Sequence, residues 1–266
     1  MKKDITARKK AASKPGKKLS KTQRQQIREK GAEQRLTIGL DLGDRHSRYC
    51  ILDEGGEVVS EATLLTTKTG LNALFEKMPS SRVALEVGTH SPWVSRHLAS
   101  LGHAVVVANP RKVKLITQST RKNDRIDAEQ LARLARVDPK LLSPIRHRGE
   151  AAQADLAVIR ARAELVEART KLINSVRGLV KAMGERLKSC DAEQVGEALG
   201  AGLSAAAQAV VMPLLKSIEA LHEQIGVYDR QIEAIAKRYP ETELLKQVYG
   251  VGTLIALTFV LTIEDP

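Results

Sequence analysis

Aromatic residues are scarce in this chain, where they make up 3% of the sequence, whereas Ala, Leu, Arg and Glu are common. That composition disfavours a β-sandwich and favours long helices. The only cysteines, Cys50 and Cys190, lie far apart in different predicted elements. Two unrelated thiols form neither a zinc signature nor a disulfide framework, which predicts a protein of the reducing cytoplasm.

Long hydrophobic runs are also missing. No apolar stretch reaches the roughly 18 residues needed to cross a membrane, and the N-terminus has no signal-peptide pattern. The sequence therefore predicts no membrane partner. Its 266 residues are enough for about two domains with a substantial core.

Acidic residues are rare in the first 35 positions, which hold thirteen basic and three acidic residues. This segment supplies +10 of the formal net charge of +12, so the rest of the chain is nearly neutral. Because it also has few apolar residues, we expect residues 1–35 to form a disordered basic tail when free. Its predicted partner is nucleic acid, although a purely solubilising tail would have the same composition.

A short apolar stretch leads to the first candidate site residue. Residues 36–40 are predicted to form a buried strand, and Asp41 follows directly, between Gly39 and Gly43. A carboxylate there is costly to bury without a partner, and the glycines let a backbone or a ligand approach it. The pattern indicates either a metal ligand or simply a polar strand end.

Glu86 stands in a similar place farther along the chain, in a second apolar strand (residues 82–88) and two positions before Gly88. The periodicity around the two acid-bearing strands predicts six other elements. They are strands at 48–52 and 57–63, a helix at 69–77, a helix from an N-cap at Ser91 to about residue 101, a strand at 103–108 and a helix at 128–136.

The resulting order, β-β-β-α-β-α-β-α, is that of the RNase H-like fold, an α/β architecture with a mixed sheet. In a sheet of that order the first and fourth strands can be neighbours. Asp41 and Glu86 would then lie within reach of one metal ion.

Two more acids, Asp124 and Asp127, lie three residues apart at the start of the last of these helices and project from one face. Acids at this position could simply complement the helix dipole. However, six basic residues crowd the same segment, as a phosphodiester-binding site requires. They are Arg111, Lys112, Lys114, Arg121, Lys122 and Arg125.

Residues 140–240 are predicted to be mainly helical. A first long helix, from residue 150 to about 188, carries a mostly apolar stripe and a basic surface that includes Arg177 and Lys181, which could bind nucleic acid. The stripe consists of Leu165, Arg169, Leu172, Val176, Leu179 and Met183.

A second long helix follows a break rich in glycine and alanine, and its apolar residues alternate spacings of four and three. That heptad seam predicts a left-handed coiled coil, formed either within the chain or between two copies. Its members are Leu214, Ile218, Leu221, Ile225, Tyr228, Ile232, Ile235 and Tyr239.

Pro240 is expected to end the second long helix. The following Gly250-Val251-Gly252 predicts a turn between helices. Backbone N–H groups of Gly250 and Gly252 could face a phosphate there, as in helix-hairpin-helix units, although any tight turn would have the same sequence.

Three of these motifs together resemble a known family. Gly39-Leu-Asp41-Leu-Gly43, Leu85-Glu86-Val-Gly88 and Lys122-Asn-Asp124-Arg-Ile-Asp127-Ala are similar to the Asp-Glu-Asp-Asp signature of insertion sequence 110 transposases. The N-terminal domain of that family is similar to the RuvC resolvase nuclease. The resemblance covers residues 36–136 motif by motif and continues more loosely beyond them.

The resemblance implies that Asp41, Glu86, Asp124 and Asp127 coordinate Mg²⁺ or Mn²⁺ for DNA strand cleavage and transfer. The chemistry agrees, because four carboxylates at one point repel each other unless cations neutralise them. Two Mg²⁺ ions about 3.5–4 Å apart could polarise a phosphodiester there. The resemblance further implies DNA and a structured guide RNA as partners, a homodimer or higher oligomer through the coiled coil, and a bacterial protein that associates with the nucleoid when bound to DNA.

The expected organisation is a basic tail (1–35), an RNase H-like catalytic domain (36–139), a helical coiled-coil domain (140–240) and the start of a C-terminal transposase domain (241–266). In the family this last domain carries a nucleophilic serine, whereas no serine follows Ser217 here. We therefore expect either a truncated or interrupted copy, or half of a system completed elsewhere, that lacks this nucleophile and does not complete recombination by itself.

Three other functions fit parts of the sequence. The segment from Gly39 to Gly43 also resembles the first phosphate loop of actin-like ATPases, but Asp44-Arg45-His46 follows it and no second loop is found. A non-catalytic coiled-coil protein would bind nucleic acid without divalent metal. A RuvC-like resolvase fits the long coil and the Gly-Val-Gly turn poorly.

Overall fold

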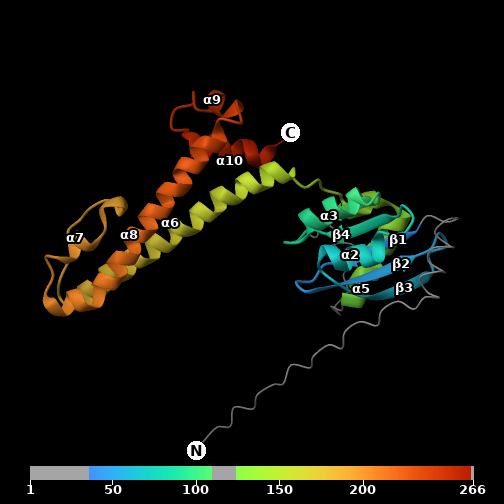
Figure 1. Cartoon of the computed structure of the whole chain (residues 1–266), viewed down its shortest axis with the longest axis horizontal. Helices are drawn as coiled ribbons and strands as arrows, with labels where there is room; N and C mark the ends of the chain where they lie inside the picture. Colours follow the sequence, from blue (N-terminus) through green and yellow to red (C-terminus); the bar gives the residue numbers. More distant parts are fainter. Residues whose placement is uncertain (1–35, 110–123, 265–266) are drawn as a thin grey trace, which may run out of the picture. The chain divides into compact units, whose positions relative to one another are not determined.

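The computed structural model describes residues 36–109 and 124–264, which fall into two compact units that divide after His147 (Figure 1). Within these residues, no helix is both long and apolar enough to cross a lipid bilayer. Several sequence predictions lie outside the described residues or side chains. They are those for the tail 1–35, for Arg111, Lys112, Lys114, Arg121 and Lys122, and for the side chains of Asp124 and Arg125.

A five-stranded mixed sheet forms the centre of the first unit. Its strands are β1 (Thr37–Asp41), β2 (His46–Leu52), β3 (Val58–Leu65), β4 (Arg82–Glu86) and β5 (Ala104–Ala108). They lie in the order β3-β2-β1-β4-β5, with β1–β2 and β2–β3 antiparallel and β1–β4 and β4–β5 parallel. The predicted order of elements and the predicted neighbours β1 and β4 are thus confirmed, and strand ends differ from prediction by a few residues.

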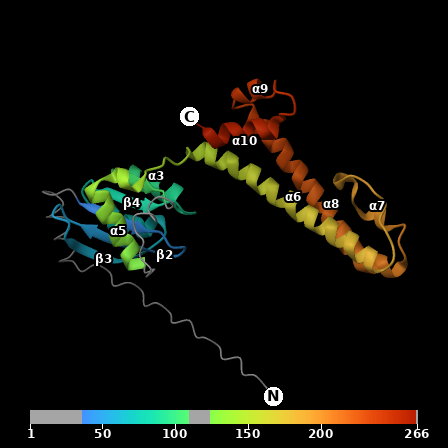
Figure 2. The same cartoon turned by 180° about the vertical axis from the view of Figure 1, so that it is seen from behind.

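Helices cover both faces of this sheet (Figures 1 and 2). The helices α2 (Lys68–Phe75) and α3 (Ser91–Ser100) lie on one face, where Ile38, Leu40 and Leu85 join the main apolar cluster. Helix α5 (Asp124–Val137) covers the other face, where alanines pack together with a few leucines such as Leu52 and Leu131. Because side chains alternate along a strand, each strand residue can be given to one of these faces.

Gly39 explains how α5 lies so close to β1. A Cβ atom at this position would stand 1.9 Å from the carbonyl oxygen of Ala128 and 2.6 Å from the nitrogen of Ala132. The backbone of α5 therefore occupies the space that a side chain would need. The sequence allowed either a backbone or a ligand to approach at Gly39, and in the structure the backbone of α5 does so.

A hairpin of two long helices forms the second unit. Helix α6 (Glu150–Ala182) packs lengthwise against α8 (Ala205–Ala236), as both views show (Figures 1 and 2). The remaining elements of the chain are short, and most cap the ends of this hairpin. They are the 3-10 turns η1 (Pro139–Leu142), which belongs to the first unit, and η2 (Ala192–Gln194), and the helices α7 (Glu197–Gly200), α9 (Glu241–Leu245) and α10 (Thr253–Ile263).

The predicted stripe of the first long helix is partly wrong. Helix α6 ends at Ala182 rather than near residue 188, and Leu179 and Met183 are 40% and 41% exposed. Ile173 and Val180 are buried instead, alongside the correctly predicted Val176 and Arg169. The stripe and the observed face differ by about one position per turn, because only the partner helix selects which of two adjacent rows is covered.

The heptad seam of the second helix packs within the chain. Ile218, Ile225, Ile232 and Ile235 are buried, and α8 ends at Ala236, before Tyr239. Leu215 is fully buried, whereas its neighbour Leu214, which the seam predicted, is only partly buried. The apolar clusters that contain these residues also hold residues of α6, and one of them includes Leu257 and Leu261 of α10. Helix α10 is therefore part of the core of this unit.

Candidate functional site

Asp41 and Glu86 end the two central parallel strands. In the register of β1 and β4, Leu40 lies opposite Leu85, so the two acids are next to each other at the same edge of the sheet. Ala84, two positions before Glu86, packs with α5, and Gly39, two positions before Asp41, touches it. Strand alternation then directs both partly buried carboxylates to the α5 face.

The direction of α5 brings its first turn towards the same edge. Its C-terminal part is fixed at the opposite edge, where Arg82 Nη1 donates a hydrogen bond of 2.8 Å to the carbonyl oxygen of Ala135. Arg136 Nη1 donates to the carbonyl oxygen of Glu54, in the turn between β2 and β3. Because Ala128 crosses β1 at Gly39, the partly buried Asp127 lies on the side of Asp41.

Two of the four predicted acids, Asp41 and Glu86, are thus neighbours at one end of one sheet face, and Asp127 lies towards that end on α5. Within the described part of the chain, no three His, Cys, Asp or Glu side chains are close enough to form a metal site by themselves. The side chain of Asp124, the fourth predicted ligand, lies outside the described part. Coordination of a metal by these acids therefore stays a prediction.

The loops that follow β1 and β4 lie against each other at this edge. His90 Nε2 is 3.7 Å from Asp44 Oδ1, and Trp93 Nε1 donates a hydrogen bond of 3.0 Å to His90 Nδ1. Gly43 shapes the first loop, since a Cβ there would stand 2.3 Å from the carbonyl oxygen of His46. His90 was not among the predicted site residues. Its position in a His-Ser-Pro-Trp segment, shortly after the acid-bearing strand β4, could have identified it.

The second loop also corrects the predicted N-cap of α3. Ser91 lies inside the helix, and the cap position is His90, which makes no side-chain capping bond. The Ser91 hydroxyl instead donates to the carbonyl oxygen of Gly88 and accepts from its N–H. A Cβ on Gly88 would meet no described atom within 4 Å, so close packing does not require this glycine.

We call the end of the sheet at which Asp41 and Glu86 lie the acidic edge. It also holds a basic residue, Arg48, that was not among the predicted site residues. Arg48 of β2 lies directly opposite Asp41 in the antiparallel register. Directly opposite residues share a face, so Arg48 also projects to the α5 side. An arginine near the centre of a strand that otherwise carries Tyr49 and Ile51 was the available signal.

The predicted nucleic-acid contacts of the second unit have different surroundings. Arg177 is half-buried and donates to the carbonyl oxygen of Cys190, so it holds the segment after α6, whereas Lys181 is exposed. The predicted turn between helices is present. Gly250 has φ +84°, which suits glycine, and Gly252 precedes α10.

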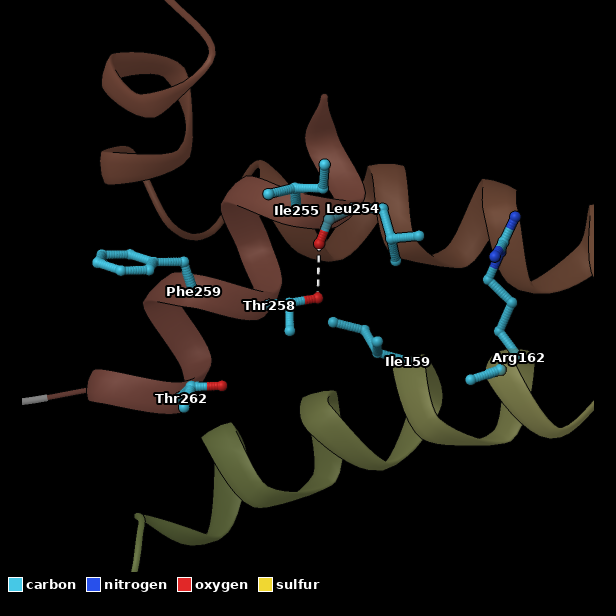
Figure 3. A pocket seen from close by; sticks show the side chains of 8 residues that line it. Ile159, Arg162, Leu254, Ile255, Thr258, Phe259 and Thr262 are labelled. Carbon is cyan, nitrogen blue, oxygen red and sulfur yellow. Dashed lines mark hydrogen bonds between the residues drawn. The ribbon is translucent and has the colours of Figure 1, made fainter. Parts of the chain in front are cut away.

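The clearest hollow in the second unit is apolar (Figure 3). It has a volume of about 500 Å³ between α6 and α10, and Ile159, Leu254 and Phe259 line it. The hydroxyl of Thr258 donates a 2.6 Å hydrogen bond to the carbonyl oxygen of Leu254, one turn earlier in the same helix. With no acid in its lining, this hollow does not resemble a metal site.

Comparisons with known proteins point to mobile DNA. The family model of DEDD-type IS110 transposases matches residues 38–184, a segment that contains all four predicted acids. The chain is 26% identical over 241 residues to the transposase for insertion sequence element IS1111A of Coxiella burnetii, covering 86% of this chain and 63% of the relative. It is 28% identical over 226 residues to a probable family 20 transposase of Pseudomonas aeruginosa, covering 82% and 65%.

A third relative is the transposase for insertion sequence element IS1328 of Yersinia enterocolitica, which is 26% identical over 229 residues, again covering 82% of this chain and 65% of the relative. The chain thus spans slightly less than two thirds of the length of these curated relatives.

Proposed function

Because the chain belongs to the IS110 family of DEDD-type insertion-sequence transposases, we propose that its first unit is an RNase H-like nuclease domain that cuts DNA strands with bound Mg²⁺ or Mn²⁺. The observation that supports this most directly is the adjacency of Asp41 and Glu86 at the ends of two parallel strands, on the face that α5 covers. Strand transfer is proposed for the whole transposase, since this chain spans only 60–65% of the length of four curated relatives.

The donor set fits a hard divalent cation. Asp41, Glu86, Asp124 and Asp127 offer only carboxylate oxygens, which Mg²⁺ and Mn²⁺ prefer over nitrogen or sulfur. Partial burial of the described acids limits competition from water. Bound ions would polarise the scissile phosphodiester and stabilise its attacking and leaving oxygens. The part of the protein is to hold these carboxylates on strand ends and a helix, where the backbone keeps them in position.

The partners follow from the same proposal. DNA is the substrate, a structured RNA guides the choice of target, and exposed cations such as Lys181 supply sequence-independent affinity. We also propose a homodimer. The predicted seam is already covered by α6, so a dimer would use apolar side chains left exposed on the hairpin, such as Leu179, Met183 and Val227.

One alternative is weakened by the geometry around Gly39. A phosphate loop of an actin-like ATPase needs open space beside its glycines, whereas the carbonyl oxygen of Ala128 would stand 1.9 Å from a Cβ at this position. A non-catalytic nucleic-acid-binding protein is another alternative, and its binding would not depend on divalent metal.

Calorimetric titration with Mn²⁺ tests the proposal. The wild type should bind Mn²⁺, and Asp41→Asn and Asp127→Asn should each weaken binding at least tenfold, because each removes one anionic ligand. Asp44→Asn is the matched control, since Asp44 lies in the adjacent loop with a side chain that is 91% exposed. Equal Mn²⁺ affinity in all four proteins would refute the metal site, and metal-independent DNA binding would then favour the non-catalytic alternative.

A further inference from the structure

Arg48 lies within the acidic edge rather than beside it. It is opposite Asp41 on one side and Thr63 on the other, in the registers of β1–β2 and β2–β3. Cys50, two positions along the same strand, packs against Ala128 and Ala132 of α5. Arg48 therefore shares the face on which α5 gathers the acids.

The guanidinium of Arg48 has an unmade hydrogen bond. Its Nε is buried, and no described atom accepts a hydrogen bond from it. A buried donor without a partner costs stability, so native structures contain few of them, and each needs an explanation. The Nε of Arg169, in the second unit, is also buried without a partner, although Nη2 of the same guanidinium pairs with Glu193 Oε1 at 3.0 Å.

We propose that Arg48 binds a non-bridging oxygen of the phosphodiester held at the acidic edge. The inference rests on the proposed nuclease function and adds to it a phosphate-binding residue outside the four acids. A guanidinium is planar and always charged, and its donors match two phosphate oxygens, so it suits this ligand better than a lysine would. The unmade bond at Nε is then completed when the nucleic acid is bound.

Charge supports the same role. Carboxylates that hold metal ions also repel the phosphodiester, and a fixed cation one strand away from Asp41 offsets this repulsion. The alternative role is to orient the Asp41 carboxylate. The two roles differ in sign, because an orienting arginine strengthens metal binding, whereas a phosphate-binding cation beside the acids weakens it.

Two variants of the full chain, Arg48→Met and Arg48→Lys, separate these roles. The probe is a fluorescein-labelled, 20-nucleotide single-stranded DNA of mixed sequence, followed by anisotropy over a range of salt concentrations. Loss of one phosphate contact should make the negative slope of log K against log salt shallower by about 0.7 and weaken binding severalfold. Arg48→Lys should keep the slope but recover only part of the affinity, since an ammonium cannot make the bidentate contact.

Arg96→Met is the matched control, because it removes one positive charge from α3, on the opposite face of the sheet. Arg96→Met should change neither the salt dependence of DNA binding nor the affinity for the DNA. In the absence of DNA, Arg48→Met should bind Mn²⁺ on the order of threefold more tightly than the wild type, since a like charge has been removed from the acids. Its melting temperature should be unchanged or higher, because a buried unpaired donor is gone.

An unchanged salt slope in Arg48→Met would overturn the inference. So would a loss of both Mn²⁺ affinity and melting temperature, which would make Arg48 a residue that orients Asp41. Failure of the proposed function gives a different result, since the wild type itself would then bind no Mn²⁺. In that case the DNA titration alone decides whether Arg48 contacts phosphate.

Discussion

Two buried polar groups, one in each unit, differ in how their hydrogen bonds are satisfied. In the helical hairpin, Asp155 is 6% exposed, and its two oxygens accept hydrogen bonds from Arg238 and from the hydroxyl of Tyr239. In the sheet unit, the buried Nε of Arg48 finds no acceptor among the described residues. The charge of Asp155 joins α6 to the segment after α8, whereas the Nε of Arg48, like that of Arg169 in the hairpin, has no described acceptor.

The surroundings of the two groups differ in the same way. Each oxygen of Asp155 has a hydrogen-bond partner. Burial, and next the hydrogen bond to Asp155, raise the pKa of Tyr239 to about 12. At the acidic edge, Asp41 and Glu86 instead end neighbouring parallel strands, and under the proposed function a bound cation would neutralise their like charges. We therefore expect substitution of Asp155 to lower stability, and substitution of Asp41 or Arg48 to act mainly on ligand binding.

The largest expected effect concerns the contact between α5 and β1. Gly39→Ala should destabilise the sheet unit by about 3 kcal/mol or more, because the new methyl group meets backbone atoms that cannot rotate away. Urea unfolding followed by the fluorescence of Trp93, the only tryptophan, measures this change. Gly88→Ala is the control and should unfold like the wild type, since its Cβ meets no described atom within 4 Å. Equal stability of the two variants would mean that α5 does not lie on Gly39.

Metal should stabilise only the sheet unit. With free Mn²⁺ at one hundred times its Kd, the free energy of unfolding of that unit should rise by about 2.7 kcal/mol. Trp93 lies on α3 and reports the sheet unit, whereas circular dichroism at the helix band reports mainly α6 and α8. EDTA should reverse the shift in the Trp93 signal. An equal shift of both signals would place the metal outside the acidic edge.

Removal of the saturated carboxylate should cost somewhat less. Asp155→Ala should destabilise the helical unit by about 2 kcal/mol, because the hydrogen bonds from Arg238 and Tyr239 are lost while Arg238 can turn to water. Tyr239→Phe should cost about 1 kcal/mol, since it removes one of these bonds. The measurement is thermal unfolding at the helix band. If Asp155→Ala is neutral, the distinction between the two units fails.

The smallest effect is a dependence of sheet stability on pH. Burial lowers the pKa of His103, whose Nδ1 accepts from the Ser81 N–H while Nε2 contacts the carbonyl oxygen of Phe75. The unfolded chain therefore takes up this proton at a higher pH than the folded chain. Its contribution to stability is complete above the ordinary pKa of about 6.5 and is lost as the pH falls through the lowered folded pKa.

His103→Gln tests this directly. The Trp93-detected stability of the wild type should fall between pH 6.5 and pH 5, and the variant should lose part of that slope. His97→Gln provides a comparison within the same unit, since His97 is a half-buried histidine of α3 whose Nε2 pairs with Asn72 Oδ1 at 2.6 Å. Identical slopes in wild type and His103→Gln would show that another group is responsible.

Much of the sheet unit could be predicted from the sequence. Apolar runs separated by turn residues predicted the strands, and their order predicted that β1 and β4 are neighbours. Asp41 and Glu86 were identified because a carboxylate at the end of a buried strand, next to glycine, is unusual enough to be noticed without a structure. The family was recognisable from these two motifs together with Lys122-Asn-Asp124-Arg-Ile-Asp127-Ala, which is the most specific of the three.

The sequence by itself therefore determined which residues share a strand, a helix or a local motif, since the repeat of the backbone sets that over a few residues. Only the tertiary structure decided what lies opposite them. It left Leu179 and Met183 exposed in α6, placed the backbone of α5 on Gly39, packed Leu257 and Leu261 of α10 into the hairpin core, and set Arg48 across from Asp41. Periodicity defines the faces of an element, but the partner that covers a face comes from a distant part of the chain, and its register is fixed only when both pack together.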